Sequence, residues 1–571
     1  MNLRALPPAL ALSFCIGSSV LPAAPAFHAW AERPPMGWNS WDCFATTVTE
    51  AQVKQHADFM ADRLLKHGWE YVVVDIQWYE PGATGYGYRS DATLVTDEYG
   101  RLLPAPNKFP GSTEGRGFKP LSDYVHAKGL KFGIHLMRGI PRQAVEKNLP
   151  ILGTPYRAAD IADKVNVCPW NPDMYGVDMS KPGAQAYYDS VIALIASWGV
   201  DYLKVDDLSR PYLRNQPEIE AVRKAIDRTG RPIVLSLSPG ETDIRAAEHV
   251  VAHANLWRIS DDFWDRWSLL ESQFGRLHAW TPWRRPGAWP DADMIPFGVI
   301  EMGRTTWFTP EEHTTLMTLW CIARSPLMLG ADLSRIDEAT LAYLTNDEVL
   351  AVNQASANNR QLFRDEQGRI GWIADVPGTG DKYLALFNAR DPWVLGESAR
   401  AWKSDPVGMG TEGQAVAFEV PVNGAHTLVL GVDDGDTGRF WWPAVWRDVR
   451  WVMADGSEQR TDRDYGSHGE KVNGLRVPEG AVALRGTGRL DDAARERGRG
   501  ETLVFSVYRY SQDEMGARGQ RVSVPVAELG LGGAVQVRDL WARRDLGRVA
   551  GDLAAEIEWH GARLYRVSSA Q

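Results

Sequence analysis

The sequence predicts an α/β fold, a (β/α)8 barrel of the TIM type, followed by an all-β region. Between Pro35 and Leu329, short apolar runs alternate with longer helical segments, which indicates a parallel sheet covered by helices. After Leu344 the helical periodicity fades, and short alternating strands with turn signals follow, as in a β-sandwich. A doubly wound sheet is the alternative for the first region.

Eight strands are expected in the barrel, with helices between them. Thr49 is expected to cap one helix, with Gln52 as its capping-box partner. A second helix is expected to begin after Ser180 and to reach Trp198. The expected strands are Met36–Trp41, Val72–Asp75, Leu130–Leu136, Tyr202–Asp206, Ile233–Ser238, Leu256–Ser260, Met294–Phe297 and Trp320–Ala323.

The composition excludes several classes of protein. Hydrophobic residues make up 44% of the chain and charged residues 24%, which excludes a fibrous or wholly disordered protein. The formal net charge of -11 gives no general attraction to nucleic acid or to an anionic membrane, so neither is an expected partner. The 24 tryptophans are unusually many, and indole rings stack well on sugar rings. An aromatic-rich core is the alternative explanation.

The first 26 residues are expected to be a signal peptide. A short positive segment ending at Arg4 precedes an apolar run to Leu21, and Ala24-Pro25-Ala26 has the small-x-small pattern of a cleavage site. Pro7, Pro8 and Gly17 interrupt the run, so cleavage is favoured over a membrane anchor. A secreted or periplasmic protein is therefore expected.

Neither the cysteines nor an acidic turn near Asp433 is predicted to hold a metal ion. Cys43, Cys168 and Cys321 would remain after cleavage, an odd number at wide spacing, which argues against a disulfide framework and against a zinc site. A single bridge among them is left open. Asp433 to Asp436 resemble a calcium loop, but a plain turn is favoured.

Charged residues gather at the expected carboxyl ends of the strands, where barrel enzymes carry their functional groups. Carboxyls with one Lys and one Arg suit glycoside hydrolysis, which needs one ionised and one protonated carboxyl. Lys204 shares a strand face with Asp206 and should keep it ionised, so Asp206 is the better nucleophile. The Asp261–Asp262 pair is the better source of the acid, because like charges raise one pKa. Asp207 and Asp261 are also explained as helix caps. The strand-end residues are Asp75, Lys204, Asp206, Asp207, Arg258, Asp261, Asp262, Asp291 and Asp293.

Several motifs, in order, resemble glycoside hydrolase family 27, the melibiase or α-galactosidase family. Asp206 lies in the segment similar to the family's nucleophile strand, and Asp262 follows Arg258 by four residues, as in its acid/base strand. The matching segments are Met36–Trp41, Tyr202–Asp206, Trp257–Asp262, Trp289–Met294, Ala323–Leu327 with Gly330, Leu344–Asn346 and Val537–Trp541.

The resemblance implies a retaining mechanism in which Asp206 attacks the anomeric carbon and Asp262 protonates the leaving oxygen. It implies an α-galactoside substrate and no metal or organic cofactor. Asp75, Lys204 and Arg258 would hold sugar hydroxyls. The expected substrate-binding residues are Trp38, Asp75, Trp78, His135, Lys204, Ser238, Arg258 and Asp293.

The resemblance also divides the chain. It implies a barrel over 27–343 and a C-terminal β-sandwich over 344–391 and 518–571. Residues 392–517 are extra relative to compact family members, and Thr427–Asp434 is similar to a carbohydrate-binding module. We expect an inserted β-rich domain there, with a purely structural elaboration as the alternative.

Three departures from the family pattern concern sugar specificity. Ile76 stands where the family has a second Asp, and His135 where it has an aromatic hydroxyl. The loop from Ser238 to Glu241 lacks the family's Cys-Glu pattern. A site without a partner for a substrate hydroxyl discriminates less well. The alternatives to α-galactose are therefore α-N-acetylgalactosamine, β-L-arabinopyranose or an α-glucosidic dextran, or an inactive sugar-binding barrel.

Overall fold

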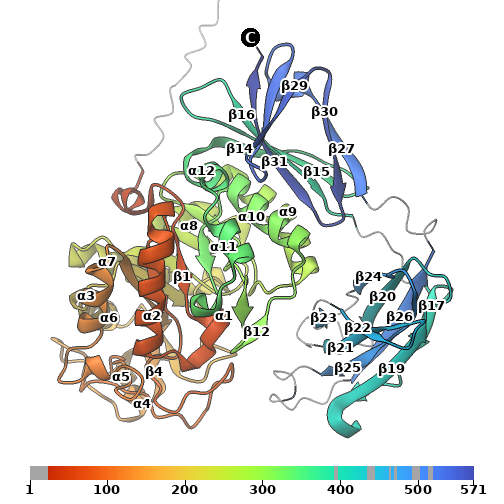
Figure 1. Cartoon of the computed structure of the whole chain (residues 1–571). Coiled ribbons are helices and arrows are strands. Elements are labelled where there is room, and N and C mark those ends of the chain that lie inside the picture. Colours follow the sequence, from red (N-terminus) through yellow and green to blue (C-terminus); the bar gives the residue numbers. More distant parts are fainter. Residues whose placement is uncertain are drawn as a thin grey trace, which may run out of the picture.

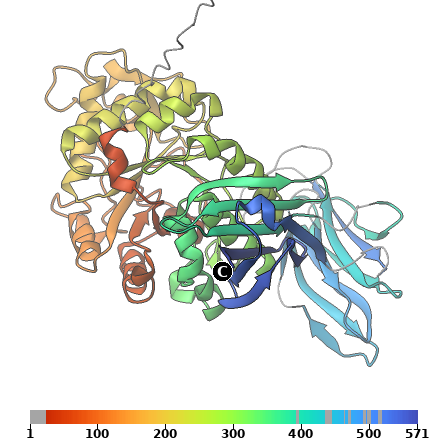
Figure 2. The ribbon, with the colours of Figure 1, turned by 90° about the horizontal axis from the view of Figure 1, so that it is seen from above.

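The computed structural model shows three parts: a barrel, a β-sandwich on one end of it, and a further β domain beside both (Figure 1). Seen from above, the further domain extends to one side of the sandwich strands (Figure 2). The described residues are 24–390, 396–433, 444–461, 464–467, 472–490, 495, 502–511 and 519–570.

Eight parallel strands form the barrel, as the sequence predicts. Their order in the sheet is β10-β9-β8-β7-β3-β2-β1-β13, and a parallel bridge from Ile295 to Leu329 joins the two ends. The strands are β1 Met36–Asn39, β2 Tyr71–Val74, β3 Lys131–Met137, β7 Tyr202–Asp206, β8 Val234–Leu237, β9 Leu256–Arg258, β10 Trp289–Asp291 and β13 Leu327–Leu329.

Helices surround the strands, and the expected cap of the first long helix is confirmed. Thr49 and Gln52 form a reciprocal capping box at its start. The second expected cap is wrong: α6 begins at Ala184, because the Ser180 hydroxyl bonds Asp178 instead. The main helices are α2 Glu50–Phe59, α3 Lys119–His126, α6 Ala184–Ser197, α7 Tyr212–Thr229, α8 Ala247–His253, α9 Trp267–Trp280, α10 Pro310–Ala323, α11 Glu338–Leu344 and α12 Asp347–Ala355.

The last two barrel strands differ from the prediction. The seventh strand is β10, which ends before the expected Met294–Phe297, and Trp320–Ala323 lies in α10 rather than in a strand. Thr309 caps α10 through a capping box with Glu312. Because α10 is buried around much of its circumference, its apolar end resembles a buried strand in the sequence.

The barrel interior is packed by side chains that alternate along the strands. Tyr71, Tyr202, Val234 and Trp289 belong to one buried cluster inside the barrel. Because side chains alternate with a period of two, Lys204 and Asp206 follow Tyr202 on the inner face of β7. The packed floor thus carries charged groups at its carboxyl end.

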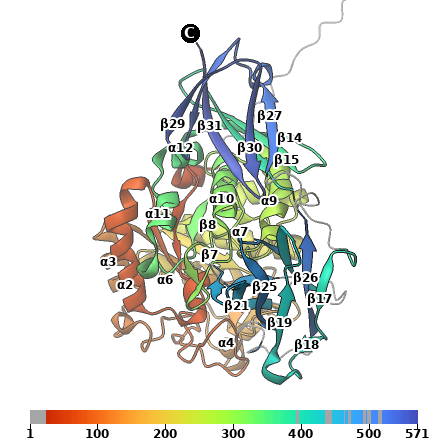
Figure 3. The ribbon, with the colours of Figure 1, turned by 45° about the vertical axis from the view of Figure 1, so that its right-hand side comes forward.

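The C-terminal sandwich packs on the barrel through α10 and its neighbours (Figure 3). The His560 ring stacks on Trp267 with centroids 3.7 Å apart, and Trp541 Nε1 donates to Thr318 at 2.9 Å. Its first strand begins at Ala357, so α12 extends beyond the expected barrel boundary at 343. The sandwich strands are β14 Ala357–Arg364, β15 Arg369–Asp375, β16 Lys382–Asn388, β27 Gly519–Pro525, β28 Val535–Asp539, β29 Arg544–Val549, β30 Asp552–Glu558 and β31 Ala562–Ser569.

Between β16 and β27 the chain forms two further sheets with a core of their own, where the sequence predicts an inserted domain. One sheet holds β17, β18, β20, β24 and β26, and the other β19, β21, β22, β23 and β25. The strands are β17 Arg400–Lys403, β18 Val407–Gly408, β19 Ala415–Pro421, β20 Thr427–Asp433, β21 Ala444–Met453, β22 Glu458–Arg460, β23 Tyr465–Ser467, β24 Val472–Arg476, β25 Ala481–Leu490 and β26 Thr502–Tyr510.

Three expectations from the sequence bear on smaller features. Residues 1–23 of the expected signal peptide, and 434–436 of the possible calcium loop, lie outside the described residues. Cys43, Cys168 and Cys321 are buried and unbridged in the described part of the chain. Among the described helices, none is both long and apolar enough to span a membrane.

Candidate active site

The predicted nucleophile Asp206 lies at the end of β7, inside the mouth of the barrel. Its Oδ2 is 3.0 Å from Nε2 of His135 on β3, and its Oδ1 is 3.9 Å from Nζ of Lys204. The Lys204 ammonium also donates to Oδ2 of Asp75, just beyond β2, at 2.9 Å. The structure thus brings four of the predicted site residues together from three neighbouring strands.

The surroundings of Asp206 favour its ionised form. Burial by itself opposes ionisation, but the attraction of Lys204 and His135, with a smaller contribution from the Ser238 hydroxyl, outweighs it, so the pKa of Asp206 falls below its usual range. The nearby carboxylates in turn raise the pKa of Lys204 despite its burial. A carboxylate that stays ionised and lacks a hydrogen bond on Oδ1 suits nucleophilic attack.

A second charged group lies at the end of β9. Nη2 of Arg258 is 2.7 Å from Oδ2 of Asp293 and 3.2 Å from Oδ1 of Asp262, and Nη1 donates to the Ser238 hydroxyl at 3.4 Å. Burial and the charge of Asp262 raise the pKa of Asp293 despite the opposing effect of Arg258. Ser238, Arg258 and Asp293 therefore lie together at the mouth, as predicted.

Exposure separates Asp262 from the other carboxyls. Its side chain is 35% exposed, against 8% for Asp206. Asp261 does not share a proton site with Asp262 as the sequence suggested, because it points to the surface and pairs with Arg210 at 2.7 Å. Asp262 is thus the open carboxyl, reachable by a leaving group and by water.

Two predicted sugar-binding residues are placed elsewhere. Trp38 and Trp78 are fully buried, and the prediction that they bind substrate is corrected by where their rings pack, against the outer helices. The Trp38 ring stacks on His56 of α2, and Trp78 packs on Phe118 next to α3. Both indoles lie between the strands and the outer helices.

Asn39, next to Trp38 on β1, was missed in the sequence. Asn39 Nδ2 donates to Asp75 Oδ2 at 2.7 Å, and its Oδ1 accepts from the backbone N–H of Trp41 at 2.8 Å. Because side chains alternate along a strand, Asn39 faces the interior while Trp38 faces outward, and Trp41 follows in the short helix α1 Trp41–Phe44. Applying the two-residue period to this strand identifies Asn39.

Asp75, His135 and Asp206 also form a cluster whose ligand atoms lie within 4.8 Å of one another, a spacing that a metal ion could bridge. The Lys204 ammonium, however, already contacts Asp75 and lies 3.9 Å from Asp206. A divalent ion would be repelled by this buried cation. The cluster is therefore better suited to sugar hydroxyls than to a metal.

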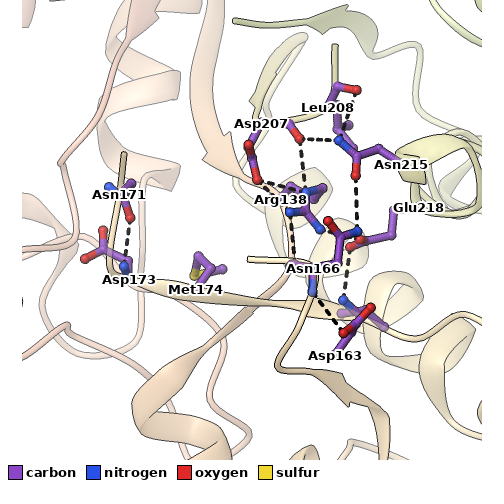
Figure 4. A network of polar contacts seen from close by, with 12 residues as sticks. Arg138, Asp163, Asn166, Asn171, Asp173, Met174, Asp207, Leu208, Asn215 and Glu218 are labelled. Atoms are coloured by element: carbon purple, nitrogen blue, oxygen red, sulfur yellow. Dashed lines mark hydrogen bonds and ion pairs between the residues drawn. The ribbon is translucent and has the colours of Figure 1, made fainter. Parts of the chain in front are cut away.

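Behind Asp206, a buried network fixes the backbone that carries it (Figure 4). The Arg138 backbone N–H donates to the carbonyl of Asp206 at 3.0 Å, and its guanidinium contacts Asp207 Oδ2 and Glu218 Oε1, each at 2.6 Å. Asn215 Nδ2 donates to the Asp207 carbonyl at 2.8 Å. Asp207 is therefore a structural residue, and its φ of 63° is held by these contacts.

Replacing Arg138 by methionine is expected to destabilise the barrel by about 3–5 kcal/mol, because Asp207 and Glu218 would remain buried without their cation. The midpoint of the barrel's urea unfolding transition measures this effect. The matched control is Arg63→Met, whose exposed pair with Glu338 should contribute at most about 1 kcal/mol. Equal shifts in the two variants would contradict the prediction.

Comparison with known proteins agrees with this geometry. The family described as "Alpha galactosidase A" matches residues 33–147 and 171–355, over half of the chain. The chain belongs to the α-galactosidase family of glycoside hydrolases, glycoside hydrolase family 27. The "Alpha galactosidase C-terminal beta sandwich domain" matches residues 503–567, a span that starts in β26 of the inserted domain.

Individual members of the family are similar over different lengths. A family 27 β-L-arabinopyranosidase from Geobacillus stearothermophilus is 40% identical, with a TM-score of 0.72, covering 96% of this chain and 100% of that chain. A protein from Bacillus halodurans described as a putative α-N-acetylgalactosaminidase is 36% identical, with a TM-score of 0.65, covering 94% of this chain and 97% of that one. Alpha-galactosidase 3 of Arabidopsis thaliana is 30% identical over 63% of this chain and 69% of its own length.

Proposed function

We propose that this chain is a retaining exo-glycosidase that releases terminal sugars of the galacto configuration. Asp206 attacks the anomeric carbon as the leaving oxygen takes the proton of Asp262. In the second step Asp262 takes a proton from water, whose oxygen attacks the anomeric carbon and frees Asp206. The observation that carries the proposal is the buried Asp206 carboxylate, held ionised by Lys204 and His135, together with the more exposed carboxyl of Asp262 in the segment that follows β9.

Two of the candidate sugars with this configuration, α-D-galactose and β-L-arabinopyranose, differ only in the exocyclic hydroxymethyl group, which the arabinopyranose lacks. Ile76 directly follows Asp75 and is buried. Because its side chain is aliphatic, it offers no hydrogen-bond acceptor to the additional hydroxyl of galactose. An unpaired hydroxyl in a closed site costs about 1–3 kcal/mol. Together with the arabinopyranosidase relative, Ile76 favours β-L-arabinopyranosides as the better substrates, with α-D-galactosides as the second candidate.

The test is kcat/KM for p-nitrophenyl glycosides of the two sugars. We expect the β-L-arabinopyranoside to exceed the α-galactoside by about tenfold or more, and Ile76→Asp to shift that ratio toward galactose by about 10- to 100-fold. Ile76→Val is the matched control and should leave the ratio within about threefold, because it adds no acceptor.

Other outcomes are informative against the proposal. A best activity on the α-glucoside or the α-N-acetylgalactosaminide would overturn the choice of sugar. Binding of sugar without turnover would favour the inactive barrel. If the wild type prefers the α-galactoside, α-galactose becomes the favoured sugar. If Ile76→Asp also leaves that preference unchanged, Ile76 does not determine specificity.

The proposal also includes export and glycan binding by the inserted domain. Export is supported by the apolar N-terminal run and the Ala24-Pro25-Ala26 site. A glycan-binding role for the insert is supported by its own two-sheet core, which makes it a separate unit joined to the sandwich. Such a module would raise the local concentration of polymeric substrate.

A further inference from the structure

In the loop between β2 and α3, the backbone that carries Tyr88 is anchored by contacts on both sides. On one side, the Tyr86 hydroxyl donates to the carbonyl of Asp42 at 2.7 Å, and Thr46 Oγ1 donates to the carbonyl of Gly85 at 2.7 Å. On the other side, Arg89 pairs with the buried Glu80 at 2.7 Å. These contacts on both sides of Tyr88 fix the backbone that presents it.

The Tyr88 ring is part of an aromatic wall beside the catalytic centre. It lies parallel to the Trp41 ring, with an interplanar angle of 4° and centroids 6.4 Å apart, and it contacts Trp170 with centroids 5.6 Å apart. Trp41 is tied through Asn39 to Asp75, which holds Lys204. The wall therefore runs from the charged floor of the site to Trp170, whose side chain is partly exposed.

The Tyr88 hydroxyl is left without a hydrogen-bond partner among the described residues, and it is not sealed from solvent. The tyrosines around it differ, since Tyr79 donates to Asp173 at 2.8 Å and Tyr86 donates to a backbone carbonyl. Burial and the nearby charges of Asp206, Asp75 and Asp262 raise the pKa of the Tyr88 phenol. The phenol thus stays protonated and is a donor without an acceptor.

We propose that Tyr88 is a substrate-contacting residue, whose ring lines one wall of the terminal-sugar subsite and whose hydroxyl donates to a ring hydroxyl of that sugar. This inference rests on the proposed function, because it needs a sugar bound between Asp75 and Asp206. A donor aimed at the sugar selects for a hydroxyl at one ring position and rejects analogues that lack it.

The test compares Tyr88→Phe with Tyr99→Phe in the full-length enzyme, using whichever aryl glycoside the wild type cleaves best. Tyr99 lies in the same loop, partly buried beside Arg101, and serves as the matched control. We expect Tyr88→Phe to lower kcat/KM by about tenfold or more, at an unchanged melting temperature, and Tyr99→Phe to stay within twofold. A Tyr88→Phe variant within twofold of wild type would overturn the proposal.

A second measurement excludes a purely structural effect. The wild type and Tyr88→Phe are each assayed on a series of aryl glycosides, every one of which lacks a different ring hydroxyl. Each deoxy substrate then closes a thermodynamic cycle with the enzyme variant. The loss caused by Tyr88→Phe should vanish on one deoxy substrate only, the one that lacks its partner. An equal loss on every deoxy substrate would overturn the contact. If the wild type cleaves none of the glycosides, the proposed function itself fails, an outcome distinct from either result for Tyr88.

Discussion

Replacing Asp206 by alanine is expected to lower kcat by at least about 10⁴-fold on every aryl glycoside that the wild type cleaves. No other carboxylate can take its place, because Asp207 is held by Arg138 behind the strand end and Asp75 is held by Lys204 and Asn39. The measurement is steady-state kcat with activated substrates. A 2-fluoro glycosyl fluoride should label Asp206 alone in the wild type, as seen by peptide mass spectrometry.

Rescue of the Asp206→Ala variant by added azide tests whether Asp206 is the nucleophile. In Asp206→Ala, azide should occupy the space left by the carboxylate and give a glycosyl azide of inverted configuration. A product of retained configuration, or label on Asp262 in the wild type, would reverse the assignment of the two carboxyls.

Replacing Asp262 by alanine is expected to slow glycosides with poor leaving groups by about 10²–10⁴-fold, and activated aryl glycosides far less, because only poor leaving groups need proton donation. The measurement is kcat/KM across a series of leaving groups of increasing pKa. Azide should rescue this variant with retained configuration, because it then attacks the glycosyl enzyme in place of water.

The neighbouring Asp261→Ala is the control for Asp262. Asp261 is 48% exposed and pairs with Arg210, so its loss should leave kcat/KM within about twofold for all leaving groups. If the Asp262 variant loses activity equally for all leaving groups, or if Asp261→Ala shows the dependence instead, the general acid is assigned to the wrong residue.

Much of the barrel could be predicted because its strands carry local signals. Tyr202–Asp206 is a short apolar run that ends in charged residues, and Thr49 with Gln52 specifies a helix start by local hydrogen bonding. The seventh and eighth strands could not be placed in the same way. The end of α10 and a buried strand are both apolar on all sides, and only tertiary packing distinguishes them.

The part of the candidate site that could be predicted from the sequence is the part in which two site residues lie on the same strand. Lys204 and Asp206 are two residues apart, so strand geometry alone places them on one face. The tryptophans were harder, because the sequence does not show which face of a strand meets the interior. Trp38 turns toward α2, whereas Trp41, three residues later, lies near the charged floor.

The sequence by itself determined the strand-end carboxyls, the Lys and Arg beside them, and the barrel that presents them, since these depend on local periodicity and spacing. Only the tertiary structure decided which charges are paired. Arg138, far from Asp207 and Glu218 in the chain, pairs with both, whereas Asp262 contacts Arg258 but stays 35% exposed, and Tyr88 keeps a hydroxyl without a partner among the described residues. The reason is physical: pairing depends on distances of a few ångströms between elements that the chain separates by tens of residues, and burial sets the strength of each pair.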